Sequence, residues 1–154
     1  PARERVIEAL REVVAEAEKQ GVVLALENHG GFPGLGEEQV EMIETIDSPN
    51  LKATIDLGNY MQCGQEGHDG TAIAAPHVGY VHVKDFKKLG ETETGWKLEP
   101  ATVGEGDVDV PACLKAIDAA GYDGYVALEY EGLEEERSGI RKSLAYVKEV
   151  VKSI

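Results

Sequence analysis

The sequence predicts an α/β fold made of parallel βα repeats, and two observations favour it. Short apolar runs alternate along the chain with longer segments whose apolar residues recur at helical spacing. Four of these runs lead into a carboxylate or imidazole side chain, at intervals typical of consecutive βα units. The predicted order of elements is α-β-α-β-α-β-α-β-α, and we expect residues 1–154 to form a single domain.

The first four elements follow from apolar spacing and from glycine. Residues 3–20 are predicted to form a helix that ends at Gly21, and residues 22–27 a strand. The glycine-rich residues 29–36 indicate a loop, and residues 37–46 a second helix. The apolar stripe of the first helix comprises Val6, Ile7, Leu10, Val13, Val14 and Ala17.

The two central strands are predicted over residues 51–56 and 78–84. Between them, residues 58–70 are polar and contain glycines, which indicates a loop, and residues 71–75 indicate a short helix. Uninterrupted apolar runs are typical of strands buried on both faces of a parallel sheet, and we expect that burial for the first strand.

The last part of the chain begins with residues 86–106, predicted to form a long irregular loop of the kind that is usually functional or mobile. A helix is expected after the Asp109 cap, with Pro111 in its first turn. Residues 125–130 indicate the fourth strand and residues 135–153 the last helix. The residues expected to be buried on that helix are Ile140, Leu144, Val147 and Val151.

The composition is that of an ordinary globular domain with a strong negative charge. The 154 residues are 42% hydrophobic and 29% charged. The net charge of -14 repels phosphate backbones and argues against a nucleic-acid partner. No apolar run is long enough to span a bilayer, so no membrane association is expected. Cys63 and Cys113 form neither a CxxC motif nor a disulfide framework, which favours a cytoplasmic location.

Side chains that bind metals lie at the C-terminal ends of all four predicted strands. The C-terminal ends of parallel strands converge on one crevice or barrel mouth. Two glutamates, one aspartate and one histidine suit Mn²⁺, Mg²⁺ or Co²⁺, and are also compatible with Zn²⁺. The predicted metal ligands are Glu27, Asp56, His82 and Glu129.

Each of these residues taken alone has an ordinary structural explanation. Glu27 and Asp56 are residue types that also cap helices and build turns. His82 stands between two valines and also fits a core histidine with satisfied hydrogen bonds. Glu129 also fits an ion pair with a lysine. The joint pattern, with all four residues at the same topological place, favours the metal site.

Four further residues are candidates near the same rim. His29 is a candidate for substrate contact, and Asn59 is a candidate that also fits a plain turn. Lys84 points to the functional face by the two-residue period of a strand, where it would neutralise an anionic intermediate or form a structural ion pair. Trp96 is expected to cover the site as part of a lid or to be ordinary packing.

At these residues the chain resembles the xylose isomerase-like sugar phosphate isomerase/epimerase superfamily of TIM barrels. The matching pieces are LALENHGG, DLGN, HVKD, VGEGDVD and ALEYEG, in the same order over nearly the whole chain. The resemblance implies a divalent metal held by the four strand-end residues. It also implies that Glu27 and Glu129 handle protons on opposite faces of the substrate. Asn59 departs from the histidine that some epimerases carry at this place.

The resemblance covers only the last four strands of an eight-stranded barrel. The expected fold is therefore a (βα)4 half of a TIM (β/α)8 barrel, preceded by one helix. Half a barrel leaves two unpaired strand edges, which are an aggregation hazard. We expect either a missing N-terminal half or a homodimer that closes the barrel.

The function predicted from the resemblance is isomerisation or epimerisation of a small sugar, sugar phosphate or sugar acid, dependent on a divalent metal and passing through an ene-diolate. Lys84 would stabilise developing oxyanion charge. The alternatives are a metal-dependent dehydratase or lyase of a polyol or keto-acid, and an inactive barrel fragment that retains only the fold. A DNA-repair nuclease is disfavoured, because that branch uses a histidine-rich multi-zinc site and this chain has four histidines.

Overall fold

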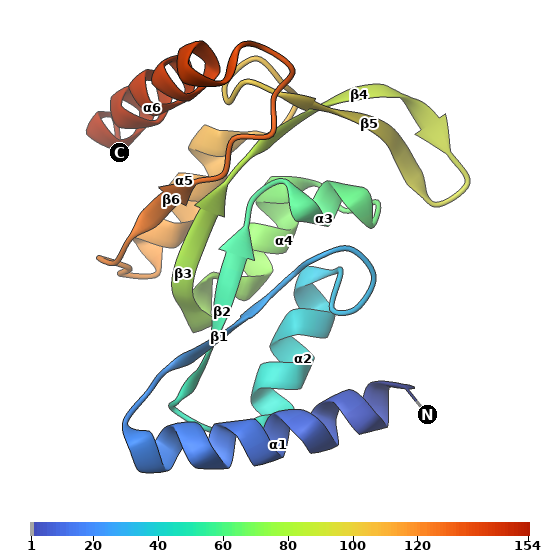
Figure 1. Ribbon diagram of the computed structural model, residues 1–154, viewed down its shortest axis with the longest axis vertical. Helices are drawn as coiled ribbons and strands as arrows, with labels where there is room; N and C mark the ends of the chain where they lie inside the picture. Colours follow the sequence, from blue (N-terminus) through green and yellow to red (C-terminus); the bar gives the residue numbers. More distant parts are fainter. Residues whose placement is uncertain (1) are drawn as a thin grey trace.

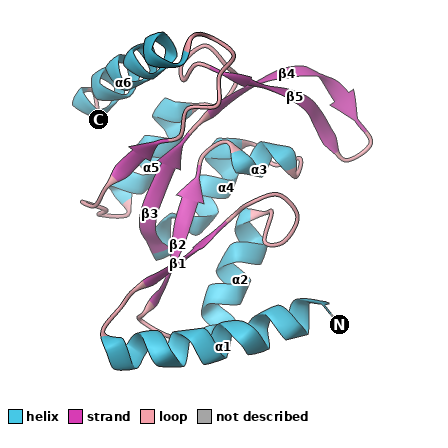
Figure 2. Cartoon of the chain, in the orientation of Figure 1, coloured by secondary structure: helices cyan, strands magenta, loops and turns pink. Residues whose placement is uncertain are grey.

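The computed structural model describes residues 2–154 and shows a four-stranded sheet with helices packed on one face (Figures 1 and 2). The sheet order is β1-β2-β3-β6, and every neighbouring pair is parallel, which confirms the predicted α/β fold. The strands are β1 (Leu24–Glu27), β2 (Leu51–Asp56), β3 (Val78–Val83) and β6 (Val126–Leu128). Within the described residues, no helix has the length and apolar character needed to cross a membrane.

The helices follow one another around the covered face, so that each packs on the next. They are α1 (Ala2–Gln20), α2 (Gly36–Ile46), α4 (Gly67–Ala74), α5 (Val110–Ala119) and α6 (Glu136–Lys152), with the short α3 (Asn59–Gln62) and the 3-10 turn η1 (Ala75–His77) between β2 and β3. The predicted caps are present. Gly21 ends α1 with a positive φ of 66°, and the Asp109 side chain accepts a hydrogen bond from the Ala112 N–H at the start of α5.

Side chains of the central strands alternate between the helix layer and an inner face. Ile55 and Val81 are fully buried in the apolar core beneath the helices. Asp56 and His82 follow them directly and therefore point to the opposite, inner face. The alternation places polar side chains on the inner face at the C-terminal ends of the strands.

The segment over residues 86–106, predicted to be an irregular loop, is mostly a β-hairpin. β4 (Asp85–Thr92) and β5 (Gly95–Ala101) pair in antiparallel fashion and project beyond the end of β3 (Figure 1). The prediction was wrong because many of the hairpin side chains are exposed, so no apolar alternation marks its strands. The turn residues Glu93 and Thr94 are also not a pair that signals a hairpin.

The loop predicted over residues 58–70 contains α3 and the first turn of α4. Gly67 and Gly70 indicated a loop, but both are helical here. A Cβ on Gly67 would come within 2.3 Å of the Leu57 carbonyl oxygen, and one on Gly70 within 2.5 Å of the Tyr60 ring. These glycines serve close helix packing, which the local sequence does not distinguish from a turn.

The outer strands and helices are less buried than predicted. Val23, at the entry to β1, is 57% exposed, and Leu144 and Val151 on α6 are 40% and 51% exposed. β6 is also shorter than predicted and spans only Val126–Leu128. These expectations were wrong because β1 and β6 are the outer strands of an open sheet, and no described residue pairs with their far edges.

Candidate metal centre

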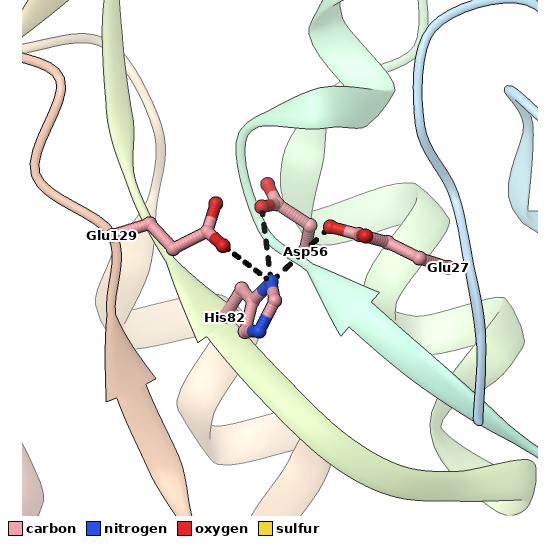
Figure 3. A group of neighbouring side chains, drawn as sticks. All are labelled: Glu27, Asp56, His82 and Glu129. Atoms are coloured by element: carbon pink, nitrogen blue, oxygen red, sulfur yellow. Dashed lines mark hydrogen bonds and ion pairs between the residues drawn. The ribbon is translucent and has the colours of Figure 1, made fainter. Parts of the chain in front are cut away.

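The four predicted metal ligands lie together at the C-terminal end of the sheet (Figure 3). Glu27 and Asp56 are the last residues of β1 and β2. His82 lies in β3 opposite Asp56 in the strand register, and Glu129 follows β6 directly. One ligand atom from each residue lies within 4.8 Å of the others. Four strands that are far apart in the sequence thus supply one cluster.

His82 stands at the centre of this cluster. Its Nδ1 lies 3.1 Å from Glu27 Oε1 and 3.1 Å from Glu129 Oε1. Asp56 Oδ2 is 3.9 Å from the same nitrogen. Figure 3 shows Glu27 and Glu129 reaching the imidazole from opposite sides. Three carboxylate oxygens and one imidazole nitrogen therefore lie close enough together to be ligands of a single cation.

Asp56 provides a test of whether these residues fit a metal. The residue is fully buried, and its Oδ1 accepts hydrogen bonds from the N–H groups of Gly58 and Asn59. Its Oδ2 has no well-directed hydrogen bond, although Lys84 Nζ lies 3.2 Å away. Burial raises the pKa of Asp56 to about 6, against the lowering effect of the Lys84 charge. Burying a carboxylate oxygen without a hydrogen bond costs free energy. A divalent cation held by the cluster would provide the missing interaction.

Lys84 neutralises part of the negative charge of the cluster. Its side chain is 2% exposed, and its Nζ lies 2.7 Å from Glu129 Oε2 and 3.3 Å from Glu131 Oε1. Burial acts to lower the pKa of Lys84, but the hydrogen bond to Glu129 and the nearby carboxylates raise that pKa above its usual value. Desolvation acts to raise the pKa of Glu129, and Lys84 outweighs it, so that pKa lies below its usual value. Both groups are therefore charged at neutral pH.

Hydrogen bonds just beyond the strands hold the ligands in register. The buried Asn28 side chain acts like a neighbouring strand, because its Oδ1 accepts from the Asp56 N–H at 2.9 Å and its Nδ2 donates to the Asp56 carbonyl at 3.0 Å. Main-chain groups do the same elsewhere: the Leu57 N–H donates to the His82 carbonyl, and the Glu129 N–H to the Val83 carbonyl. Sheet-like pairing therefore continues past the ligand positions.

Replacement of Asn28 by alanine is expected to weaken divalent-cation binding by about 10- to 100-fold, because Asn28 positions both Glu27 and Asp56. Isothermal titration with Mn²⁺ measures the affinity. The matched control is Asn50→Ala, since Asn50 Nδ2 donates to the Val22 carbonyl and so joins the same two strands at their other end. Equal Mn²⁺ affinities for the two variants would show that Asn28 has no positioning role.

Of the other predicted site residues, His29 and Asn59 lie next to members of the cluster, whereas Trp96 lies on the β4–β5 hairpin. His29 is 69% exposed beside the cluster, with its Nδ1 3.7 Å from Glu27 Oε2. Asn59 begins α3, is buried, and has an Nδ2 without a hydrogen-bond partner. Trp96 lies on the hairpin under the Lys88 ammonium, at 3.9 Å from the ring centroid, and lines a depression beside α2 and α4. Substrate contact by His29, Asn59 and Trp96 stays a prediction.

Besides Asn28, two further residues with structural importance for the candidate site were not predicted as site residues. Glu131 reaches Lys84 from the segment after β6, and its signal is the two-residue spacing from Glu129. The buried Asp85 carboxylate accepts hydrogen bonds from four backbone N–H groups, those of Phe86, Gly104, Gly106 and Val108. The sequence signal for this role of Asp85 is the glycine-rich segment that packs against it, where a Cβ on Gly106 would lie 2.2 Å from Asp85 Oδ1.

A parallel βα sheet with acidic and imidazole side chains at its carboxyl edge defines a (β/α)-barrel type of protein with a candidate metal centre. Residues 1–150 match the sequence profile described as "Xylose isomerase-like TIM barrel". The chain belongs to this family.

Curated relatives and solved structures agree with the assignment. An uncharacterized protein of Methanocaldococcus jannaschii, MJ1311, is 29% identical over 130 residues, covering 82% of this chain and 43% of that protein. Inosose dehydratase of Clostridium perfringens is 26% identical over 135 residues, covering 80% of this chain and 46% of the enzyme. The xylose isomerase domain protein of Planctomyces limnophilus superposes with a TM-score of 0.82 at 22% identity, over 98% of this chain and 52% of the other.

Other structural neighbours are described as metal-bound proteins or as sugar epimerases. They include a xylose isomerase-like TIM barrel protein of Mycobacterium smegmatis in complex with magnesium (TM-score 0.80, 22% identity, 99% and 52% coverage). A D-tagatose 3-epimerase-like protein matches with a TM-score of 0.72 at 25% identity, over 97% of this chain and 57% of the other. The chain therefore spans about half the length of the relatives and structures that it matches.

Proposed function

We propose that this chain carries the metal-binding and proton-transferring half of an isomerase or epimerase that acts on a small sugar, sugar phosphate or sugar acid. The observation that carries the proposal is the placement of Glu27 and Glu129 on opposite sides of His82 within one candidate metal cluster. The cluster would hold one divalent cation through Glu27, Asp56, His82 and Glu129. Mn²⁺, Mg²⁺, Co²⁺ and Zn²⁺ all suit this mixed oxygen and nitrogen set.

The two glutamates supply the proton transfers. When bound, the cation would polarise the substrate carbonyl and the adjoining hydroxyl. Glu129, which Lys84 keeps as a carboxylate, would accept the proton from the carbon next to the carbonyl, and the electron pair of the broken C–H bond would enter an ene-diolate. Glu27, once protonated, would return a proton to the opposite face and become a carboxylate. Lys84 lies beside Glu129 and would stabilise the developing negative charge.

Dehydration of a polyol or keto-acid is the second candidate, supported by the 26% identity to inosose dehydratase. It starts with the same removal of a carbon-bound proton, but water leaves from the neighbouring carbon. The mass of the product therefore separates the two reactions. A catalytically silent unit that binds the cation is the remaining alternative.

Exchange of carbon-bound protons tests the proposal. The chain is incubated in D₂O with Mg²⁺ and either D-tagatose or an inosose, and NMR follows deuterium entering the carbon next to the carbonyl. We expect exchange that falls by at least about 100-fold in Glu27→Gln and in Glu129→Gln. Glu44→Gln serves as control, because Glu44 lies on α2 next to His77, away from the cluster.

The outcomes are distinct. Exchange with loss of water from the product would favour the dehydratase. Cation binding without exchange on either sugar would contradict a catalytic role for the chain by itself. The barrel closure expected from the sequence, by a second copy or by another half, is consistent with the half-length match to the relatives.

A further inference from the structure

The ammonium of Lys84 is shared between carboxylates of two kinds. Its Nζ lies 2.7 Å from Glu129 Oε2, 3.2 Å from Asp56 Oδ2 and 3.3 Å from Glu131 Oε1. Asp56 and Glu129 are members of the candidate metal cluster, whereas Glu131 is not. Within residues 2–154, Glu131 is therefore the one carboxylate paired with this ammonium that a cation in the cluster would not bind.

The ammonium and a divalent cation require the same oxygen atom. Asp56 Oδ1 already accepts hydrogen bonds from the N–H groups of Gly58 and Asn59, so Oδ2 is the oxygen left to bind a cation. Lys84 Nζ lies against that Oδ2. Two positive charges at one oxygen repel each other. Cation binding at Asp56 would therefore drive the ammonium away from this carboxylate.

The Lys84 ammonium would still need a partner after this displacement. The Lys84 side chain is 2% exposed, and a buried charge without a paired group is strongly unfavourable. Glu131 Oε1 already accepts a hydrogen bond from Nζ, and this contact is the longest of the three ion pairs. The Glu131 side chain is 48% exposed, so water hydrates part of its charge. Glu131 is therefore suited to hold the ammonium more closely as it leaves Asp56.

The residues on either side of Glu131 are packed in place. The hydroxyl of Tyr130 donates a hydrogen bond to the Glu134 carbonyl oxygen at 3.3 Å. On the other side, a Cβ on Gly132 would lie 2.9 Å from the backbone nitrogen of Thr102. Within the part of the chain that the structure describes, the lysine ammonium is the only group that pairs with the Glu131 carboxylate. The backbone thus fixes this carboxylate beside the ammonium.

We infer that Glu131 is a positioning residue for the metal centre, and that it holds the Lys84 ammonium when Asp56 Oδ2 binds a divalent cation. The ammonium stays paired in this way, and the buried oxygen becomes available to the cation. Glu131 acts only through Lys84 and contacts neither the cation nor the substrate. The inference rests on the proposed function for the bound cation, but not for the proton transfers.

A double-mutant cycle with Mn²⁺ as the probe tests this role, and isothermal titration of the metal-free chain measures the affinity. Glu131→Gln removes the charge and keeps the size of the side chain. We expect it to weaken Mn²⁺ binding by about 10-fold, the lower end of the range for groups that act from outside the coordination shell. In a Lys84→Met background the same replacement should change the affinity by less than about 2-fold, because the ammonium that Glu131 holds is absent.

Glu149→Gln is the matched control, because Glu149 also pairs with a lysine, Lys152, but on the exposed surface of α6. This variant should bind Mn²⁺ as the wild type does. Circular dichroism first establishes that each variant is folded.

Unchanged affinity in Glu131→Gln would overturn the inference, whether or not Lys84→Met folds. An equal loss in both backgrounds would also overturn it, because Glu131 would then act through its own charge or through the fold. These two results would leave the metal centre standing. A wild-type chain that binds no Mn²⁺ would instead contradict the metal centre, and the inference with it.

Discussion

Replacement of His82 by alanine is expected to weaken Zn²⁺ binding by about 100-fold or more. A contact that orients a metal ligand from outside the coordination shell is worth 10- to 100-fold, and His82 is itself a proposed ligand. Its Nδ1 lies within 3.9 Å of carboxylate oxygens from all three acidic members of the cluster. Loss of an imidazole should reduce affinity for Zn²⁺ more than for Mg²⁺, because Mg²⁺ prefers oxygen ligands.

Isothermal titration of metal-free protein with each cation measures this difference. His77→Ala is the control, because His77 also lies near a carboxylate, at 3.5 Å from Glu44 Oε1, but on the 3-10 turn before β3. We expect one ion per chain for the wild type and for His77→Ala. Equal Zn²⁺ affinity in the wild type and His82→Ala would exclude His82 as a ligand.

Part of the candidate site could be predicted because the information is local. A charged residue at the end of an apolar run is visible in a few letters, and Glu27 and Asp56 were found in this way. The parallel topology then brings all four strand ends together without further information. The α/β order was predictable for a similar reason, because the spacing of apolar residues within each short segment distinguishes helices from strands.

Residues whose role depends on a distant main-chain atom were not predicted from the apolar spacing. Asn28 bonds to the backbone of Asp56, and Asp85 to N–H groups after the hairpin, so neither contact leaves a periodic pattern. The exposure of Leu144 and Val151 also escaped prediction. An apolar stripe shows that a helix face is suited to burial, but it does not show whether another segment of this chain covers that face.

Replacement of Lys84 by methionine is expected to destabilise the metal-free fold by about 3 kcal/mol, at the lower end for breaking a buried ion pair. The ammonium is 2% exposed and lies close to Asp56, Glu129 and Glu131. Its removal leaves the fully buried Asp56 carboxylate without a neighbouring cation. Urea unfolding in EDTA measures the change, and Lys142→Met is the control. Lys142 is 51% exposed, and its pair with Glu134 is screened by solvent, so Lys142→Met should leave the stability nearly unchanged.

The same substitution should strengthen cation binding, because Lys84 competes with a bound cation for oxygens of Asp56 and Glu129. Added Mg²⁺ is therefore expected to restore more stability to Lys84→Met than it adds to the wild type. A cation at 100 times its dissociation constant contributes about 2.7 kcal/mol. A variant that is less stable without metal and binds metal more tightly would show that the ammonium and the cation balance the same charges. Unchanged stability in EDTA would instead show that the cluster does not need Lys84 to fold.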